Sequence, residues 1–117
     1  MRSMDLFDEI KTLTKKLVSI PSMNATSGER DIADAIEAYL RDIPYFKAHP
    51  ELVITQDLKE DPLHRRNVMA LLKGGEGTER DTIMLHGHID TVDVDDFGKY
   101  KEFAFDCDKL VEAFREA

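Results

Sequence analysis

Residues 82–92 read Thr-Ile-Met-Leu-His-Gly-His-Ile-Asp-Thr-Val, an apolar run that leads into two histidines and an aspartate. We predict a strand from Thr82 to about Gly87, and its apolar residues on both faces are typical of a strand inside a sheet. The two histidines and the aspartate stand at alternate positions, so in an extended chain they point to the same side. Ligand sites of open α/β sheets gather where strands end, so this segment is the first candidate for a functional site.

The rest of the chain shows the hydrophobic spacing of helices and strands. The expected elements are helices over 5–19 and 28–42, strands over 52–57, 67–72 and 82–87, and a helix over 106–117. Ser3 or Asp5 can cap the first helix, and Thr26 and Glu29 have the spacing of a capping box for the second. Asp106 can cap the last helix, whose apolar side we expect to face inward.

These elements indicate a fold class. The strand over 67–72 is apolar on both faces, like the one after it, and such strands need helices on both sides of their sheet. We therefore expect a layered α/β fold in the order helix, helix, strand, strand, strand, helix. Only three helices are available to cover the sheet, which suggests that the sheet is truncated. The chain has 117 residues, within the range of one domain, and no internal repeat.

Composition excludes several classes of partner. The net charge of −8, from 24 acidic and 16 basic residues, argues against nucleic acid, which is bound by clustered Lys and Arg. The basic pairs Lys15-Lys16 and Arg65-Arg66 are expected to be solvated surface. No apolar run approaches the roughly 18 residues of a membrane span, and the N-terminus lacks the pattern of a secretory signal.

The chain has a single cysteine, Cys107, so no disulfide can form within it. A reducing cytoplasm fits this composition. We expect Cys107 to be a small, partly buried residue rather than a nucleophile, because no histidine lies near it in the sequence.

The spacing of His88 and Asp90 fits a metal ligand and its supporting group. An imidazole can bind zinc through one ring nitrogen while a carboxylate holds the proton on the other. A hydrogen-bonded pair on the surface, without any metal, is the alternative interpretation of the same spacing.

The segment Gly-His-Ile-Asp-Thr-Val, residues 87–92, resembles the first signature of the co-catalytic zinc metallopeptidases and amidohydrolases related to aminoacylase, carboxypeptidase G and succinyl-diaminopimelate desuccinylase. Residues 17–40 resemble the opening of that family, and residues 65–74 resemble the strand before its signature. Residues 90–114 depart from the commonest members and are closer to the RocB branch, which is associated with arginine utilisation. The likeness covers almost the whole chain, although only the signature is specific.

The resemblance implies a layered α/β/α zinc-exopeptidase-like fold, of which residues 1–117 form the N-terminal part, with no second domain. It implies that His88 binds one zinc ion and that the catalytic-site residue Asp90 orients this histidine. His86 matches a variable position and is not expected to be a ligand. In the family two zinc ions share a water, and the substrates are N-acyl amino acids or small peptides.

The other residues that the family uses to hold its two zinc ions have no match in this chain. A catalytic zinc needs three protein ligands and an open position, and this chain supplies at most one matched ligand. His49 and His64 belong to expected loops, and nothing places them beside His88. The acidic loop residues that follow are expected to be solvated. We therefore expect the N-terminal portion of a longer hydrolase, inactive as this chain alone.

Two other interpretations compete with this one. The motif His-x-His-x-Asp-His of metallo-β-lactamase-like hydrolases matches residues 86–90, but Thr91 stands where its last histidine is needed. A non-enzymatic interaction or dimerisation module is the main alternative, in which an exposed strand edge pairs with a partner or a second copy. A homo-oligomer is therefore one expected form of the chain.

Overall fold

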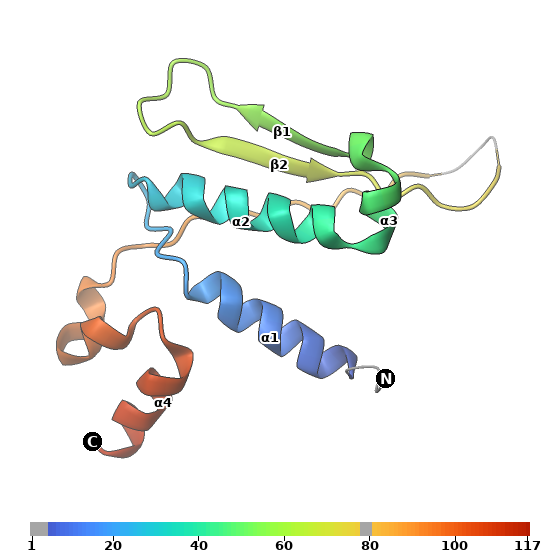
Figure 1. Cartoon of the computed structure of the whole chain (residues 1–117). Helices are drawn as coiled ribbons and strands as arrows, with labels where there is room; N and C mark the ends of the chain where they lie inside the picture. Colours follow the sequence, from blue (N-terminus) through green and yellow to red (C-terminus); the bar gives the residue numbers. More distant parts are fainter. Residues whose placement is uncertain (1–4, 78–80) are drawn as a thin grey trace.

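The computed structural model describes residues 5–77 and 81–117. In chain order the elements are α1 (Leu6–Val18), α2 (Gly28–Asp42), α3 (Pro44–Ala48), the 3-10 helix η1 (Pro50–Leu52), β1 (Val53–Asp57), β2 (Arg66–Ala70), the 3-10 helix η2 (Asp95–Phe103) and α4 (Cys107–Arg115). Helices and a small sheet together make this a mixed α/β structure (Figure 1). Within the described residues, no helix combines the length and apolar character that a membrane span requires.

The three long helices begin close to their predicted positions. At α2 the carboxylate of Glu29 accepts a hydrogen bond from the N–H of Ala25 at 2.8 Å, and the hydroxyl of Thr26 accepts from Gly28 at 3.3 Å. The predicted capping box is therefore not formed, because the helix is capped at Ser27 without a side-chain hydrogen bond, although Thr26 and Glu29 both accept hydrogen bonds from neighbouring backbone N–H groups. Asp106 caps α4 as predicted, since its carboxylate accepts from the N–H of Lys109. Asp5 stands at the start of α1 without a capping hydrogen bond, and Ser3 lies outside the described residues.

The sheet is an antiparallel hairpin of β1 and β2, with α2 packed along one face (Figure 1). The register places Val53 opposite Ala70 and Ile54 opposite Met69. Val53 is buried because α2 and α3 cover its side of the hairpin, while Ile54 on the other side is 53% exposed. The buried apolar residues of the described part of the chain are Ile32, Ala33, Phe46, Leu52 and Val53, of which Phe46, Leu52 and Val53 form one cluster.

The expected third strand is wrong. Residues 82–87 have no regular secondary structure, and Ile83, Met84 and Leu85 are 86%, 85% and 93% exposed. A strand exists only beside another strand that completes its hydrogen bonds, and no described residue forms backbone hydrogen bonds with this segment. Of the glycine-rich turn expected before it, residues 78–80 lie outside the described residues.

The expected burial of β2 on both faces is also wrong. Met69 is 47% exposed, and the residues that follow the strand, Leu71 and Leu72, are 47% and 69% exposed. The reason is that α2 covers one face, and no described element covers the other. The described residues therefore form one helical layer on a two-stranded sheet, and they do not confirm the layered α/β/α fold.

The interpretation of Arg65-Arg66 as solvated surface is wrong as well. The Arg66 side chain is only 15% exposed, and its guanidinium pairs with Asp34 and, at 3.1 Å, with Glu37 of α2. Partial burial alone would raise the pKa of Asp34, but hydrogen bonds from Arg66 and Arg30 lower it. Arg65 pairs with Asp61 and Glu29. The ion pairs of Arg65 with Glu29 and of Arg66 with Asp34 and Glu37 join α2 to the hairpin.

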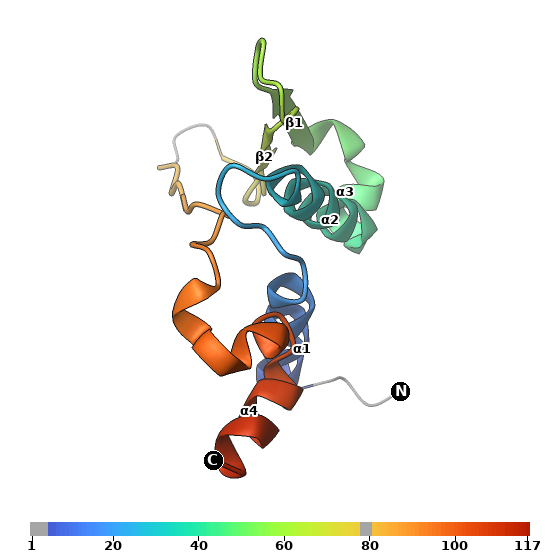
Figure 2. The ribbon, with the colours of Figure 1, turned by 90° about the vertical axis from the view of Figure 1, so that its left-hand side faces the viewer.

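The C-terminal elements pack against α1 rather than the sheet. The ammonium of Lys15 lies 2.5 Å from the carboxylate of Asp108 in α4, and Figure 2 shows α4 beside α1. The rings of Tyr100 and Phe114 meet edge to face at 4.7 Å. The inward orientation expected for α4 is partly wrong, because Phe114 remains 55% exposed. Cys107 is a free, partly exposed residue at the start of this helix, as expected.

The molecule is open. Its radius of gyration is 17.6 Å, against roughly 13 Å for a compact domain of this length. Its accessible surface is 9650 Å², against roughly 6,500 Å² for a folded monomer of this mass. Large apolar side chains such as Leu6, Leu72 and Leu85 are two-thirds exposed or more, so the described elements do not close around a single core.

Candidate metal-ligand site

The backbone of the candidate site is held by the loop between α1 and α2. The N–H of Thr91 donates to the carbonyl of Ser22 at 2.9 Å, and the N–H of Asn24 donates to the carbonyl of Thr91 at 2.8 Å. These two hydrogen bonds form a short parallel bridge between Met23 and Thr91. The segment that ends in Thr91 is therefore anchored at one point, although no strand of the described residues pairs with it.

His88 and Asp90 lie together just before this anchor. The Nδ1 atom of His88 lies 3.0 Å from Oδ1 of Asp90 and 2.9 Å from the Asp90 carbonyl oxygen. Both oxygens are acceptors, so Nδ1 must carry the hydrogen. In the neutral imidazole Nε2 then presents its lone pair, and the side chain is 84% exposed while that of Asp90 is 35% exposed. This is the tautomer and orientation that a metal-binding histidine requires.

The remaining histidines are placed elsewhere. His49 ends α3, where its ring contacts Tyr45 at 5.0 Å and Glu51 lies 3.7 Å from its Nδ1. His64 lies in the loop between the strands, and its carbonyl accepts from Arg30. His86 is exposed in the extended segment. In residues 5–77 and 81–117, no three His, Cys, Asp or Glu side chains come together in a way that could hold a metal ion.

The acidic residues after the site have local roles. Asp93 accepts a hydrogen bond from the N–H of Asp95, and Asp95 pairs with Lys101. Asp106 caps α4, and Asp108 pairs with Lys15. Of the residues predicted for the site, His88 thus offers an exposed Nε2 that suits zinc. It can serve as a single ligand, and the described residues do not complete the site around it.

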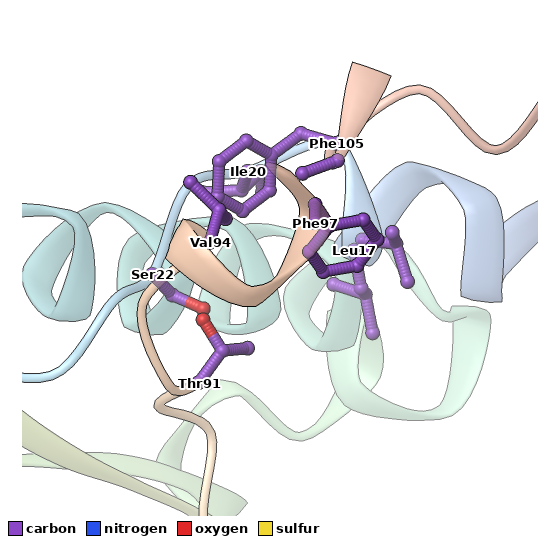
Figure 3. A pocket seen from close by; sticks show the side chains of 9 residues that line it. Leu17, Ile20, Ser22, Thr91, Val94, Phe97 and Phe105 are labelled. Atoms are coloured by element: carbon purple, nitrogen blue, oxygen red, sulfur yellow. The ribbon is translucent and has the colours of Figure 1, made fainter. Parts of the chain in front are cut away.

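A small apolar pocket borders the anchor (Figure 3). Its volume is about 160 Å³, and the side chains of Ser22 and Thr91 point toward one another at its edge. The other lining residues are Leu17, Val18, Ile20, Val94, Phe97, Ala104 and Phe105. The sequence did not indicate this pocket, because it forms where η2 returns to the end of α1.

Comparison with known proteins supports the relationship to RocB. The chain is 43% identical over 107 residues to "Protein RocB" of Bacillus subtilis (strain 168), which is 92% of this chain and 19% of that protein. It is 31% identical over 109 residues to "Uncharacterized protein YqjN" of the same organism, which is 93% of this chain and 19% of that protein. No family model matches the chain, and no solved structure matches it.

The chain therefore spans about a fifth of the length of the curated relatives it matches. Its sequence relationship to RocB, predicted from residues 90–114, is confirmed over most of the chain. The names of these relatives mention neither zinc nor peptide hydrolysis, so the enzymatic class belongs to the proposal that follows.

Proposed function

We propose that this chain is part of a zinc-dependent amidohydrolase or metallopeptidase that cleaves N-acyl amino acids or small peptides. His88 would bind one zinc ion through Nε2, and Asp90 would hold its ring in the binding orientation. The observation that carries the proposal is the contact of 3.0 Å between His88 Nδ1 and Asp90 Oδ1, with the opposite side of the ring open to solvent. A carboxylate behind a ligating histidine raises its basicity as well as fixing its tautomer.

Zinc in such a site lowers the pKa of a bound water and polarises the scissile carbonyl. A catalytic zinc needs three protein ligands, and the described residues bring one suitable histidine to the site. The other ligands would therefore come from further polypeptide. The length of the relatives supports this proposal, since the matched region is only 19% of each.

The exposed apolar residues are consistent with a surface that further polypeptide covers. Ile54 and Met69, paired on the open face of the hairpin, are about half exposed, and Leu85 is 93% exposed. Soluble monomers rarely expose large contiguous apolar patches. We further propose that the complete protein shares the cellular role of RocB, which the branch resemblance associates with arginine utilisation in the cytoplasm.

The alternative is a non-enzymatic module that pairs with a second copy. The free edge of β2 and the exposed residues 83–85 favour it, because unpaired strand edges template further pairing. Sedimentation equilibrium separates the two functions. A concentration-dependent dimer without zinc affinity would favour the module, whereas a zinc-binding chain whose affinity depends on His88 supports the hydrolase.

The direct test is equilibrium dialysis of the purified 117-residue chain against zinc. We expect weak binding that His88→Ala abolishes and that His86→Ala leaves unchanged. His86 is the matched control, because it is an exposed histidine of the same segment that does not contact Asp90. We also expect no release of amino acid from an N-acetyl amino acid by this chain alone. Equal zinc binding by the wild type and His88→Ala would contradict the proposal.

A further inference from the structure

Gly28, the first residue of α2, is packed directly against the loop that precedes the helix. It is buried, and a Cβ atom added there would lie 1.7 Å from the carbonyl oxygen of Pro21. It would also lie 2.8 Å from the carbonyl carbon of Pro21 and 3.2 Å from Cα of Ser22. All three atoms are backbone, so no flexible side chain can move aside to accept a larger residue.

The part of the loop that touches Gly28 is also the part that holds the candidate site. Ser22 is 3% exposed, and its carbonyl accepts the hydrogen bond from the N–H of Thr91. Two residues further on, the N–H of Asn24 donates to the carbonyl of Thr91. A displacement of Pro21 and Ser22 away from α2 would therefore move or break the bridge at Thr91.

The bridge in turn fixes the residue that orients the histidine. Asp90 directly precedes Thr91, and both its carbonyl oxygen and Oδ1 accept from Nδ1 of His88. The sequence of contacts thus runs from Gly28 through the loop and Thr91 to Asp90 and His88. Among the described residues, segment 81–90 makes no backbone–backbone hydrogen bond to the helices, so the bridge at Thr91 is the attachment that follows it directly.

We propose that Gly28 is a positioning residue for His88. Because Gly28 has no side chain, the loop before α2 can lie close to the helix and hydrogen-bond Thr91. Thr91 then holds Asp90 where its carboxylate keeps the imidazole of His88 in the Nδ1–H tautomer. The purpose of this device rests on the proposed zinc site. The effect of Gly28 on the tautomer of His88 needs no metal, so it can be measured in the metal-free chain.

The test uses the full chain labelled with ¹⁵N in histidine, without metal, at about pH 8, where imidazole is mostly neutral. Long-range proton–nitrogen spectra report which ring nitrogen carries the hydrogen. In the wild type we expect His88 in the Nδ1–H tautomer, and in Gly28→Ala a loss of that preference. We also expect the amide of Thr91 to exchange about tenfold faster in Gly28→Ala, because local opening sets its protection.

Gly87→Ala is the matched control. Gly87 directly precedes His88, yet nothing lies within 4 Å of a Cβ added there. We expect this variant to keep the Nδ1–H tautomer. A change of the His88 tautomer in Gly28→Ala but not in Gly87→Ala could not arise from an effect confined to the neighbours of His88 in the sequence.

If Gly28→Ala fails to fold, as judged by circular dichroism and by the amide of Val53 in the core, Asn24→Pro replaces it. Asn24 is an exposed loop residue, and a proline at this position lacks the N–H that donates to the carbonyl of Thr91. We expect His88 to lose its tautomer preference while the core amides stay protected. Retention of the Nδ1–H tautomer in a folded Gly28→Ala or Asn24→Pro chain would overturn the proposal. Absence of zinc binding with the coupling intact would count against the proposed function alone.

Discussion

The imidazole of His88 and the carboxylate of Asp90 face each other across 3.0 Å, two residues apart on a segment that pairs with no strand in the part of the chain that the structure describes. Their contact depends on local spacing and on the bridge that anchors Thr91 to the loop before α2. It places the ring hydrogen on Nδ1 and leaves Nε2 exposed, with its lone pair available for metal binding. The predictions below test this pair, the elements that carry it and the open surface around it.

The first prediction concerns the charge of Asp90. Asp90→Asn keeps an acceptor oxygen near Nδ1 of His88 but removes the negative charge, so the histidine becomes a weaker ligand. We expect zinc affinity to fall by about tenfold, the lower end of the range for groups that support a metal ligand. Isothermal titration with zinc measures this. Asp96→Asn, at an exposed acidic residue of η2, is the control that should leave the affinity unchanged. Equal losses in both variants would mean that general charge, rather than the contact, matters.

The second prediction concerns Asp61 and acid stability. The side chain of Arg65 hydrogen-bonds Asp61 and lowers the pKa of that carboxyl from 3.8 to about 2, with help from the Arg65 backbone N–H. A carboxyl with a lower pKa in the folded state stabilises the fold above its unfolded pKa and loses this contribution as pH falls through the folded value. The contribution is therefore complete above about pH 5 and disappears between about pH 4 and pH 2.

Thermal unfolding of the wild type and Asp61→Asn at several pH values checks this. We expect the wild type to melt at a higher temperature at neutral pH and the two curves to converge near the acid end. A difference in melting temperature that stays constant as pH falls would show that the charge of Asp61 is not the cause.

The third prediction concerns the ion pairs between α2 and the hairpin. The Arg66 side chain is 15% exposed and pairs with Asp34 and Glu37. Arg66→Ala leaves these carboxylates without this partner, and we expect the free energy of unfolding to fall by about 1.5 kcal/mol, the lower end of the range for hydrogen bonds to charged groups, because the Asp34 side chain is 46% exposed. Urea unfolding followed by circular dichroism measures it. Arg115→Ala, an exposed arginine in the last turn of α4, should change stability by less than about 0.5 kcal/mol.

The fourth prediction concerns residues 82–87. They have no strand partner among the described residues, so their amides should exchange with solvent at nearly unprotected rates. The amide of Met69 in β2 should exchange far more slowly, because Met69 lies opposite Ile54 in a hydrogen-bonded pair of the hairpin, in register with the hydrogen bonds from Leu71 to Leu52 and from Leu58 to Arg65. Hydrogen exchange read by NMR distinguishes the two segments. Protection of residues 82–87 comparable to that of Met69 would restore the third strand that the sequence predicted.

Elements with local signals were predictable from the sequence. Pro21, the capping residues before Gly28, and Asp106 mark helix boundaries through neighbours a few residues away, and the structure places the helices accordingly. The contact of His88 and Asp90 was predictable for the same reason, since alternate residues of an extended chain share a side.

Features that depend on distant parts of the chain were not predictable. The apolar residues at 82–87 favour a strand, but a strand needs a neighbour, and none of the described segments provides one. The same absence of a covering layer leaves Met69 exposed. The contact of Gly28 with Pro21 and the hydrogen bond from Thr91 to Ser22 join residues whose spacing carries no signal. Arg66 looked like a surface residue because only the fold brings α2 beside it.

The most direct test of the central claim is whether zinc binds Nε2 of His88. In the ¹⁵N-histidine-labelled chain, addition of zinc should shift the Nε2 resonance of His88 while Nδ1 keeps its hydrogen and His86 shows no change. A zinc response at His86, His49 or His64 with His88 unaffected, or no histidine response at all, would contradict the account.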